Sequence, residues 1–190
     1  INLTDVQETF NLANGGVTFT DQGDAGDTIN GGTGNDIIEG DDGNNVINAG
    51  AGNDQVQGSA GSDTLDGGAG ALDRLFYSND TAGVTLDIGA GTGTGGLADG
   101  DTFSNFEGFF GGSGNDNFIG DGGNHTFAGG AGNDTINAAG GDDEVQISSG
   151  VDTLDGGAGT DTLRFDSETA DVTVNLATNS ISGGDSTGDT

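Results

Sequence analysis

Residues 31 to 39 read GGTGNDIIE, and the chain continues in the same pattern as GDDGNNVIN (40 to 48), AGAGNDQVQ (49 to 57) and GSAGSDTLD (58 to 66). The period is nine residues. It extends back into QGDAGDTIN at 22 to 30 and forward into GGAGALDRLF at 67 to 76, which contains one extra residue. Self-similarity in register at a short fixed period is the signature of a solenoid.

A second block of six units begins at residue 111 with GGSGNDNFI and ends at residue 164 with GGAGTDTLR. The eighth position is apolar in all twelve units: Ile29, Ile38, Ile47, Val56, Leu65, Leu75, Phe118, Phe127, Ile136, Val145, Leu154 and Leu163. Each unit therefore predicts a six-residue Gly/Asp turn followed by a three-residue strand whose central side chain points inward. Two units would close one 18-residue turn of a flattened all-β coil, and successive turns would stack as parallel strands.

The composition shows that such a chain needs a partner for its charge. There are 32 acidic residues against 2 basic ones, a net charge of -30, and only 30% of the residues are hydrophobic. Without neutralisation this composition is typical of disorder. Nucleic acid and anionic membranes are excluded as partners by charge, whereas cations fit. The absence of Cys excludes disulfides and thiolate zinc sites, and no apolar run is long enough to span a membrane.

The units resemble GGxGxDxUx, the calcium-binding nonapeptide of the repeats-in-toxin (RTX) family, over twelve units or about 108 residues. The resemblance implies a right-handed parallel β-roll that binds several Ca²⁺ ions between the turns of units i and i+2. It also implies export through a bacterial type I secretion channel, folding in extracellular calcium, and an extracellular or cell-surface location.

The resemblance further implies the ligands. The sixth position of each turn would supply a side chain: Asp27, Asp36, Asn45, Asp54, Asp63, Asp73, Asp116, Asp134, Asp143, Asp152 and Asp161. Carbonyl oxygens would come from the first and third positions: Gly31, Thr33, Ala49, Ala51, Gly111, Ser113, Gly129, Ala131, Gly156 and Ala158. Five intervals keep Asp on both sides, namely 36/54, 54/73, 116/134, 134/152 and 143/161, with 54/73 weakened by the extra residue. Asn45 lowers the charge of two intervals, although it can offer an amide oxygen, and His125 makes the interval 125/143 weak or empty.

Two longer segments, 77 to 110 and 165 to 190, resemble one another at an offset of 88 residues: VTLDI at 84 to 88 matches VTVNL at 172 to 176. We therefore expect two tandem modules, 22–110 and 111–190, preceded by a strand-forming cap at 1–21, with the longer segments adding strands and wider loops to the same solenoid. The second copy stops where the first continues to Phe110, so we expect the native chain to go on.

Other readings of single residues carry less weight. His125 has no second His or Cys for catalysis or transition-metal binding, and Arg74 and Arg164 are expected to pair with nearby Asp. The acids outside the turns, such as Asp80, Asp87, Glu107, Glu168 and Asp171, form no catalytic constellation. A patch of Phe103, Phe106, Phe109 and Phe110 favours core packing over a binding surface. Ice binding would need rows of Thr that the chain lacks.

The sequence therefore predicts a non-enzymatic, calcium-dependent module of an adhesin, surface layer or filament. The alternative is a noncatalytic accessory module of a type I secreted enzyme or toxin. End-to-end association with neighbouring modules or with other copies is a further expectation, because an open solenoid end exposes strand edges.

Overall fold

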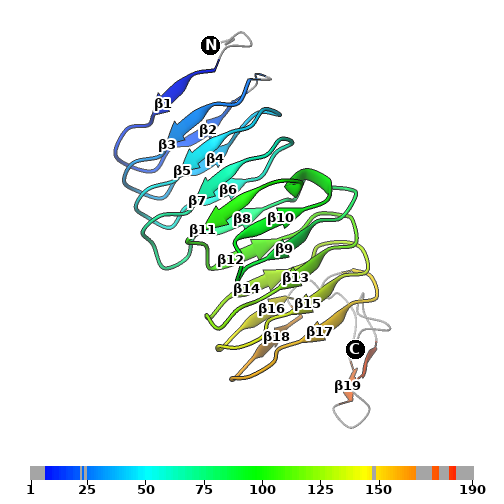
Figure 1. The fold of residues 1–190 in the computed structure, drawn as a ribbon. Helices are drawn as coiled ribbons and strands as arrows, with labels where there is room; N and C mark the ends of the chain where they lie inside the picture. The colour runs from blue at the N-terminus through cyan, green and yellow to red at the C-terminus, as the bar shows by residue number, and fades with distance from the viewer. Residues whose placement is uncertain are drawn as a thin grey trace.

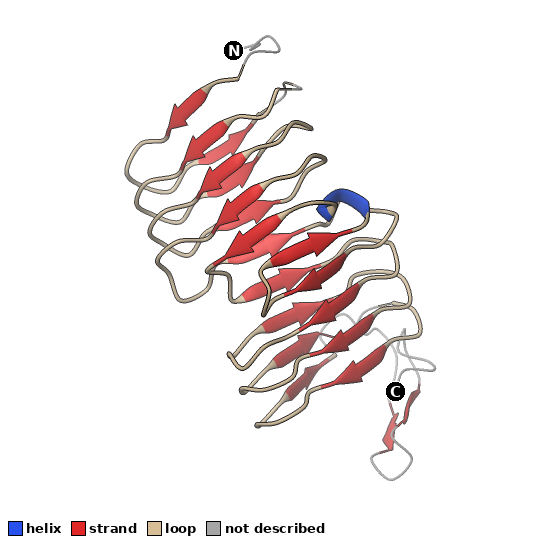
Figure 2. Ribbon diagram, viewed as in Figure 1, coloured by secondary structure: helices blue, strands red, loops and turns tan. Residues whose placement is uncertain are grey.

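In a computed structural model, the chain forms an all-β solenoid whose short strands stack along one axis (Figure 1). The structure describes residues 7–21, 23, 25–146, 149–165, 173–175 and 180–182. Loops join the strands, and a single 3-10 turn, η1 (Gly96–Ala98), interrupts the pattern (Figure 2). None of the helical segments in this described part has the length and apolarity needed to cross a membrane.

All twelve strands that the repeat predicts are present, each at the last three positions of its unit. The first block contains β3 (Thr28–Asn30), β4 (Ile37–Glu39), β5 (Val46–Asn48), β6 (Gln55–Gln57), β7 (Thr64–Asp66) and β8 (Arg74–Phe76). The second contains β13 (Asn117–Ile119), β14 (Thr126–Ala128), β15 (Thr135–Asn137), β16 (Glu144–Gln146), β17 (Thr153–Asp155) and β18 (Thr162–Arg164).

Within each block, a strand pairs with the second strand along the chain, not with the next one. Ile29 lies opposite Ile47 in one sheet and Ile38 opposite Val56 in the other, both in parallel register. This spacing confirms the 18-residue turn. β1 (Thr9–Asn11) and β2 (Thr18–Thr20) add one strand to each sheet in the same parallel manner, so the segment before the repeats forms strands, as expected.

The segment between the blocks continues both sheets, but unequally. It contributes β9 (Thr85–Asp87), β10 (Thr92–Thr94) and β11 (Thr102–Ser104) to the first sheet and β12 (Gly108–Phe110) to the second. The orders are β1-β3-β5-β7-β11-β10-β9-β13-β15-β17 and β18-β16-β14-β12-β8-β6-β4-β2. β10 runs antiparallel to β9 and β11, a direction that the sequence did not predict, in a solenoid whose repeat strands pair in parallel.

Two extra strands in one sheet amount to about 10 Å along the stacking axis, because neighbouring strands lie about 4.8 Å apart. The strands of the second block are accordingly displaced sideways from those of the first in Figure 1. Both sheets nevertheless run without a break through residues 110 and 111, where the sequence predicts a module boundary. The division into two modules stays a prediction.

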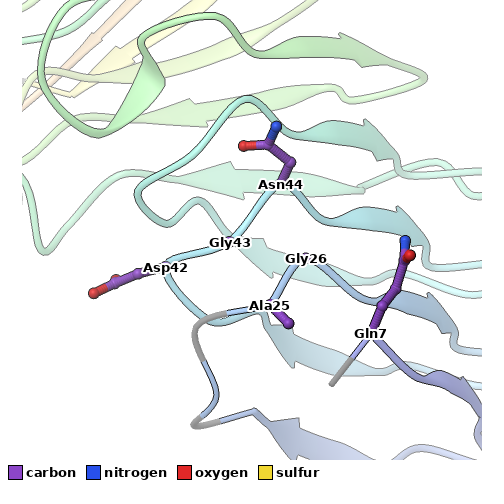
Figure 3. Close-up of a pocket in the computed structure, with 6 residues that line it drawn as sticks. All are labelled: Gln7, Ala25, Gly26, Asp42, Gly43 and Asn44. Atoms are coloured by element: carbon purple, nitrogen blue, oxygen red, sulfur yellow. The ribbon is translucent and has the colours of Figure 1, made fainter. Parts of the chain in front are cut away.

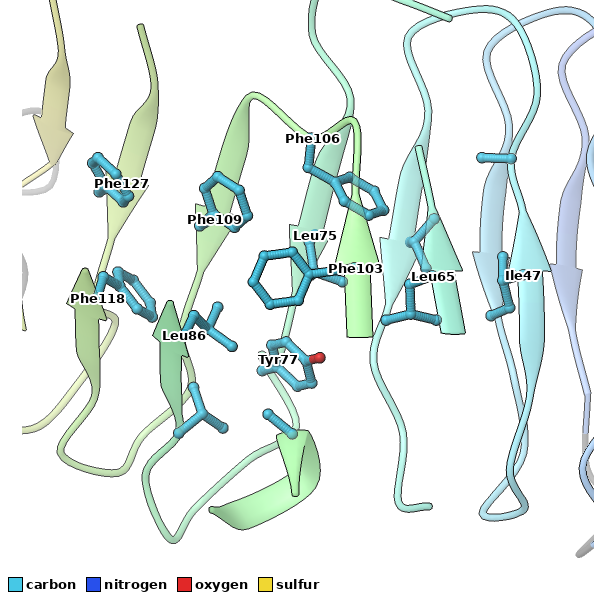
Figure 4. Packing of buried hydrophobic residues seen from close by; sticks show 14 of the residues in the cluster. Ile47, Leu65, Leu75, Tyr77, Leu86, Phe103, Phe106, Phe109, Phe118 and Phe127 are labelled. Atoms are coloured by element: carbon cyan, nitrogen blue, oxygen red, sulfur yellow. The ribbon is translucent and has the colours of Figure 1, made fainter. Parts of the chain in front are cut away.

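Aromatic side chains fill the junction (Figure 4). Phe103, Phe106 and Phe109 are 7%, 4% and 1% exposed, and Phe110 stacks on Phe76 with ring centroids 4.5 Å apart. Core packing is therefore confirmed for Phe103, Phe106 and Phe109, whereas Phe110 is only partly buried and lies outside the core cluster.

The apolar column ends differently from the prediction. Ten of its twelve members are buried, but Leu154 is only partly buried and Leu163 is 37% exposed. β17 and β18 are the last strands of their sheets, and no strand among the described residues stacks on the far side of either. Within the same described part, β19 (Thr173–Asn175) and β20 (Ser180–Ser182) pair with each other and not with the solenoid, where strands of this segment were expected. The rest of 165–190 after Phe165 lies outside the described residues.

Replacing Ile38 with Ala should destabilise the calcium-loaded protein by about 2 to 4 kcal/mol, because its side chain is fully buried and leaves a cavity. The neighbouring Ile37→Ala serves as the control: Ile37 is in the same strand but 46% exposed, so we expect a change within about 0.5 kcal/mol. Denaturant unfolding at saturating calcium measures both. Equal losses would contradict the inside-outside assignment.

Candidate metal centres in the turns

The sixth-position aspartates form a column of side chain to backbone hydrogen bonds along each edge of the solenoid. Asp36 donates its N–H to Asp54 Oδ1 at 2.7 Å, and Asp54 donates its N–H to Asp73 Oδ1 at 2.7 Å. On the other edge, Asp134 accepts from Asp116 at 2.8 Å. One carboxylate oxygen of each residue is thus held in place by the turn one layer earlier. The extra residue in the unit ending with Phe76 does not break this column.

The second carboxylate oxygen has no such partner. The Oδ2 atoms are buried and without a hydrogen bond in five of these residues: Asp36, Asp54, Asp73, Asp134 and Asp143. A buried carboxylate oxygen without a donor is costly, and native folds satisfy such groups with a hydrogen bond or a cation. The atoms that face these oxygens decide which of the two applies.

Carbonyl oxygens of the next layer converge on the same points. A Cβ added to Gly31 would lie 2.8 Å from Asp36 Oδ2 and in contact with the carbonyl oxygen of Ala49. A Cβ on Gly111 would likewise contact both Asp116 Oδ2 and the carbonyl oxygen of Gly129. The first-position glycine therefore leaves room where oxygens from two layers meet. Calcium is bound in proteins by oxygen sets of this kind, so the residues present fit the ion.

Several third-position carbonyls, which are also expected ligands, already accept a backbone bond. Gly34 donates its N–H to Ala51 at 2.7 Å and Gly141 donates to Ala158 at 3.0 Å, while Thr33 accepts from Gly15. A carbonyl oxygen has a second lone pair, so this bond does not prevent coordination. The fourth-position glycines that donate here have positive φ, +113° at Gly34, a conformation that favours glycine.

The fifth position of the unit forms a second column of hydrogen bonds, which the sequence pattern did not predict. Asn35 Oδ1 accepts the N–H of Asn53 at 2.9 Å, and Asn115 Oδ1 accepts the N–H of Asn133 at 2.8 Å. These bonds run in the opposite direction along the stack to those of the Asp column. The signal was present, because Asn recurs before Asp in the GND sequences of both blocks.

The junction continues the carboxylate columns with residues that the sequence analysis did not assign. Asp63 donates its N–H to Asp101 Oδ1 at 2.7 Å, and Asp73 donates to Glu107 Oε2 at 2.9 Å. Glu107 therefore has a structural role, where none was expected. Both residues could have been found, because DTFS at 101–104 and EGFF at 107–110 match the last four positions of a unit without its GGxG.

At Asp63 and Asp101, hydrogen-bond donors of the protein contact the second carboxylate oxygen, so that no cation is needed there. Tyr77 donates its hydroxyl to Asp101 Oδ2 at 2.6 Å, and Ser59 donates to Asp63 Oδ2 at 3.1 Å. Asp80, which the sequence left unassigned, is also buried and accepts backbone N–H groups, including that of Leu97 at 2.9 Å. These acids stabilise the junction, and their oxygens are used within the fold.

Asn45 and His125, the two exceptions in the sixth position, each direct a side-chain nitrogen toward their own turn. The amide nitrogen of Asn45, not its oxygen, contacts the carbonyl oxygens of Asp41 and Gly43. His125 Nε2 lies 2.9 Å from Asp121 Oδ1. The pKa of Asp121 is lowered by the N–H of Gly123, and further by His125. Neither exception presents an unpaired oxygen where the aspartates do.

The two arginines differ in their contacts. Arg164 contacts Glu144 Oε1 at 2.8 Å across neighbouring strands. Arg74 has no ion pair with any described residue, and its aliphatic part packs near Gly108 instead. The expected Asp partner is therefore not found for Arg74.

Burial and like charge raise the pKa of several turn carboxyls. The pKa of Asp63 and of Asp134 is about 7, chiefly because burial disfavours the charged form. Burial also raises the pKa of Asp27 to about 6, with Asp21 and Asp41 adding hydrogen-bonding and charge contributions. In the absence of a cation, the fold thus holds carboxyl groups that are reluctant to ionise.

One family is found by comparison with known proteins. The family model described as the RTX calcium-binding nonapeptide repeat (4 copies) matches residues 21–56, 52–71, 110–145 and 148–167, which together cover more than half of the chain. No curated protein matches the chain. The matched segments coincide with the two blocks of turns whose oxygens converge.

The raised pKa values predict that the calcium-free chain keeps more strand structure at pH 5 than at pH 8. An unfolded Asp titrates near 3.8 and folded Asp63 and Asp134 near 7, so the folded state binds more protons between these values. Their contribution to stability is full below about pH 4 and is lost as the pH rises through 7. Far-UV circular dichroism in calcium-free buffer measures this. Equal strand signal at both pH values would contradict it, and the Asp63→Asn/Asp134→Asn double variant should flatten the dependence.

Proposed function

This chain belongs to the RTX calcium-binding nonapeptide repeat family, and on that premise we propose that it is a secreted structural segment of a bacterial surface protein, which folds when it meets extracellular calcium. RTX repeats bind calcium, and several repeats bind several ions. Such modules are structural and typical of secreted proteins.

The observation that carries the proposal is the buried Oδ2 atom without a hydrogen-bond partner, which in the turn of Asp36 lies beside the carbonyl oxygen of Ala49 in the next layer. It supports calcium in the intervals 36/54, 54/73, 134/152 and 143/161. In the interval 116/134 the same oxygens converge, although Gly112 also donates its N–H to Asp116 Oδ2 at 2.9 Å. Glu107 adds a sixth candidate interval, 73/107, because Asp73 Oδ2 is unpaired there.

Charge explains why the fold depends on the ion. The columns place carboxylates of successive layers about one strand spacing apart, which opposes folding wherever they are ionised. A Ca²⁺ ion in an interval removes that repulsion and supplies a partner for the unpaired oxygen. Since the sites exist only in the folded chain, the free energy of binding becomes free energy of folding.

A structural array, as in an adhesin, surface layer or filament, is the use that we propose for this scaffold. The acids of the junction support it, because Asp80, Asp101 and Glu107 accept hydrogen bonds within the fold. The modules 22–110 and 111–190 would then be repeating elements of a longer stack. Sequence on either side of this chain tests the proposal: further modules agree with it, whereas a catalytic domain would make the chain an accessory module of a secreted enzyme or toxin.

Calcium titration tests calcium-dependent folding directly. Without calcium at pH 8 the chain should be largely unfolded, and calcium at about 0.1 to 1 mM, typical of extracellular modules, should produce strand signal in circular dichroism. Excess chelator should reverse the change, and Mg²⁺ at the same concentration is the control. Strand signal that persists unchanged in chelator would refute the proposal.

Restoring the aspartate at His125 should add one ion. In His125→Asp the new carboxylate would face the 138–143 turn as Asp36 faces the 49–54 turn, so we expect one more bound Ca²⁺ per chain than in the wild type. His125→Asn removes the imidazole without adding charge and should not gain an ion. Equilibrium dialysis measures the stoichiometry. The same count in His125→Asp and the wild type would contradict the assignment.

A further inference from the structure

Two of the twelve units have Asp in the second position and lack it in the sixth. Only the units that begin at Gly40 and Gly120 lack Asp in the sixth position, where they have Asn45 and His125. The same two units, and no others among the twelve, have Asp in the second position, Asp41 and Asp121. The loss of one acid therefore coincides with the gain of another in the same turn.

In the first of these turns, the amide of Asn45 occupies the place of the missing carboxylate oxygen. Its Oδ1 accepts the N–H of Asp27 at 2.8 Å, which directs its Nδ2 inward. Nδ2 donates to the carbonyl oxygens of Asp41 at 2.9 Å and Gly43 at 3.0 Å. Asn45 therefore directs a donor into its own turn and presents no carboxylate oxygen to the interval 45/63.

The Asp41 side chain leaves this turn and points toward the previous one. Its Oδ1 accepts the N–H of Gly43 at 3.0 Å, while its Oδ2 is buried without a hydrogen-bond partner. The residue is only 5% exposed. Its carboxylate oxygen lies within 4.8 Å of oxygens of Asp21 and Asp27, which themselves lie within 4.8 Å of one another. Three buried carboxylates from two successive turns of the same edge therefore meet.

Asp21 reaches this point because it takes the first position of its turn. It directly follows β2, and its N–H donates to the carbonyl of Glu39 at 3.1 Å, as Gly31 donates to Asn48 at 2.8 Å. In the other turns this position is where a Cβ would meet the converging oxygens. An Asp in this place directs its own carboxylate into the interval. Asp21 lies six positions before Asp27, whereas in a regular unit the first position lies five positions before the sixth.

We infer that Asp21, Asp27 and Asp41 form a divalent-cation site of the calcium class in the interval 27/45, which the sequence alone marks as weak. The inference rests on the proposed function and deepens it. Three buried carboxylates so close together repel one another unless a cation or a proton lies between them. All donors are carboxylate oxygens, which a hard ion such as Ca²⁺ prefers.

The other unit with Asp in the second position, which begins at Gly120, shows the opposite outcome. Asp121 Oδ1 contacts His125 Nε2 at 2.9 Å and accepts the N–H of Gly123 at 2.7 Å, and its side chain is 40% exposed. Its carboxylate is bound by donors of its own turn and lies outside the 4.8 Å cluster. Asp121 is therefore a matched control: the same position in the repeat, without the site.

A second control lies beside the site. Asp42 is exposed, and its side chain projects away from the turns around an open hollow of about 530 Å³ lined by Gln7, Ala25, Gly26, Asp42, Gly43 and Asn44 (Figure 3). Asp42→Asn removes one negative charge, as Asp41→Asn does, at the next residue of the chain. Any general effect of charge on calcium binding would appear in Asp42→Asn as well.

The test counts bound Ca²⁺ per chain by equilibrium dialysis with calcium as the only divalent ion. Asp41→Asn and Asp21→Asn should each bind one ion fewer than the wild type, and the double variant should also lose only one, because both residues serve the same ion. Asp42→Asn and Asp121→Asn should keep the wild-type count. Asp41→Gly, which restores the glycine of most other units, should lose the same ion with unchanged far-UV circular dichroism at saturating calcium.

The outcomes separate the two claims. If the wild type binds no calcium, the proposed function fails. If the wild type binds several ions and Asp41→Asn and Asp41→Gly keep the full count, the site is refuted while the proposed function stands. Loss of two ions in the double variant would also refute a shared site, as would an equal loss in Asp42→Asn.

Discussion

The hydrogen bond from one turn aspartate to the backbone N–H of the turn before it is the constraint on which the rest of the molecule depends. It holds one carboxylate oxygen in place and directs the other into the narrow space between two layers. The same contact that orders the turns therefore collects negative charge along both edges of the solenoid. A chain with a net charge of -30 can keep this arrangement only with cations or protons between the layers.

In some turns, hydrogen-bond donors of the protein take the place of an ion. Where Asn45, Tyr77 with Ser59, or His125 with Asp121 occupies a turn, hydrogen-bond donors point at oxygens that elsewhere lack a partner. Each replacement lowers the need for an ion locally and leaves the backbone register intact. The scaffold therefore tolerates some intervals that bind an ion and others whose oxygens are satisfied by hydrogen-bond donors. The number of intervals of the first kind determines how many ions the fold requires.

The junction shows how far the apolar column tolerates irregular strand order. β10 runs against its neighbours, and one sheet gains three strands where the other gains one, yet the core continues through Leu75, Phe109 and Phe127 (Figure 4). Large aromatic rings bridge the unequal spacing. Stacking against one continuous core, with no break in either sheet, joins the two blocks into one solenoid.

The sequence by itself determined the period, the twelve strands, the inward apolar column and the calcium class of the turns, because in-register repeats have local geometry that each unit carries within nine residues. It did not reveal the antiparallel β10, the exposure of Leu163 or the roles of Asp101 and Glu107, since these depend on which strand lies next in the stack. Nor did it bring Asp21, Asp27 and Asp41 together. Only the tertiary structure decided that, because contacts between layers 18 or more residues apart are set by the winding of the whole chain.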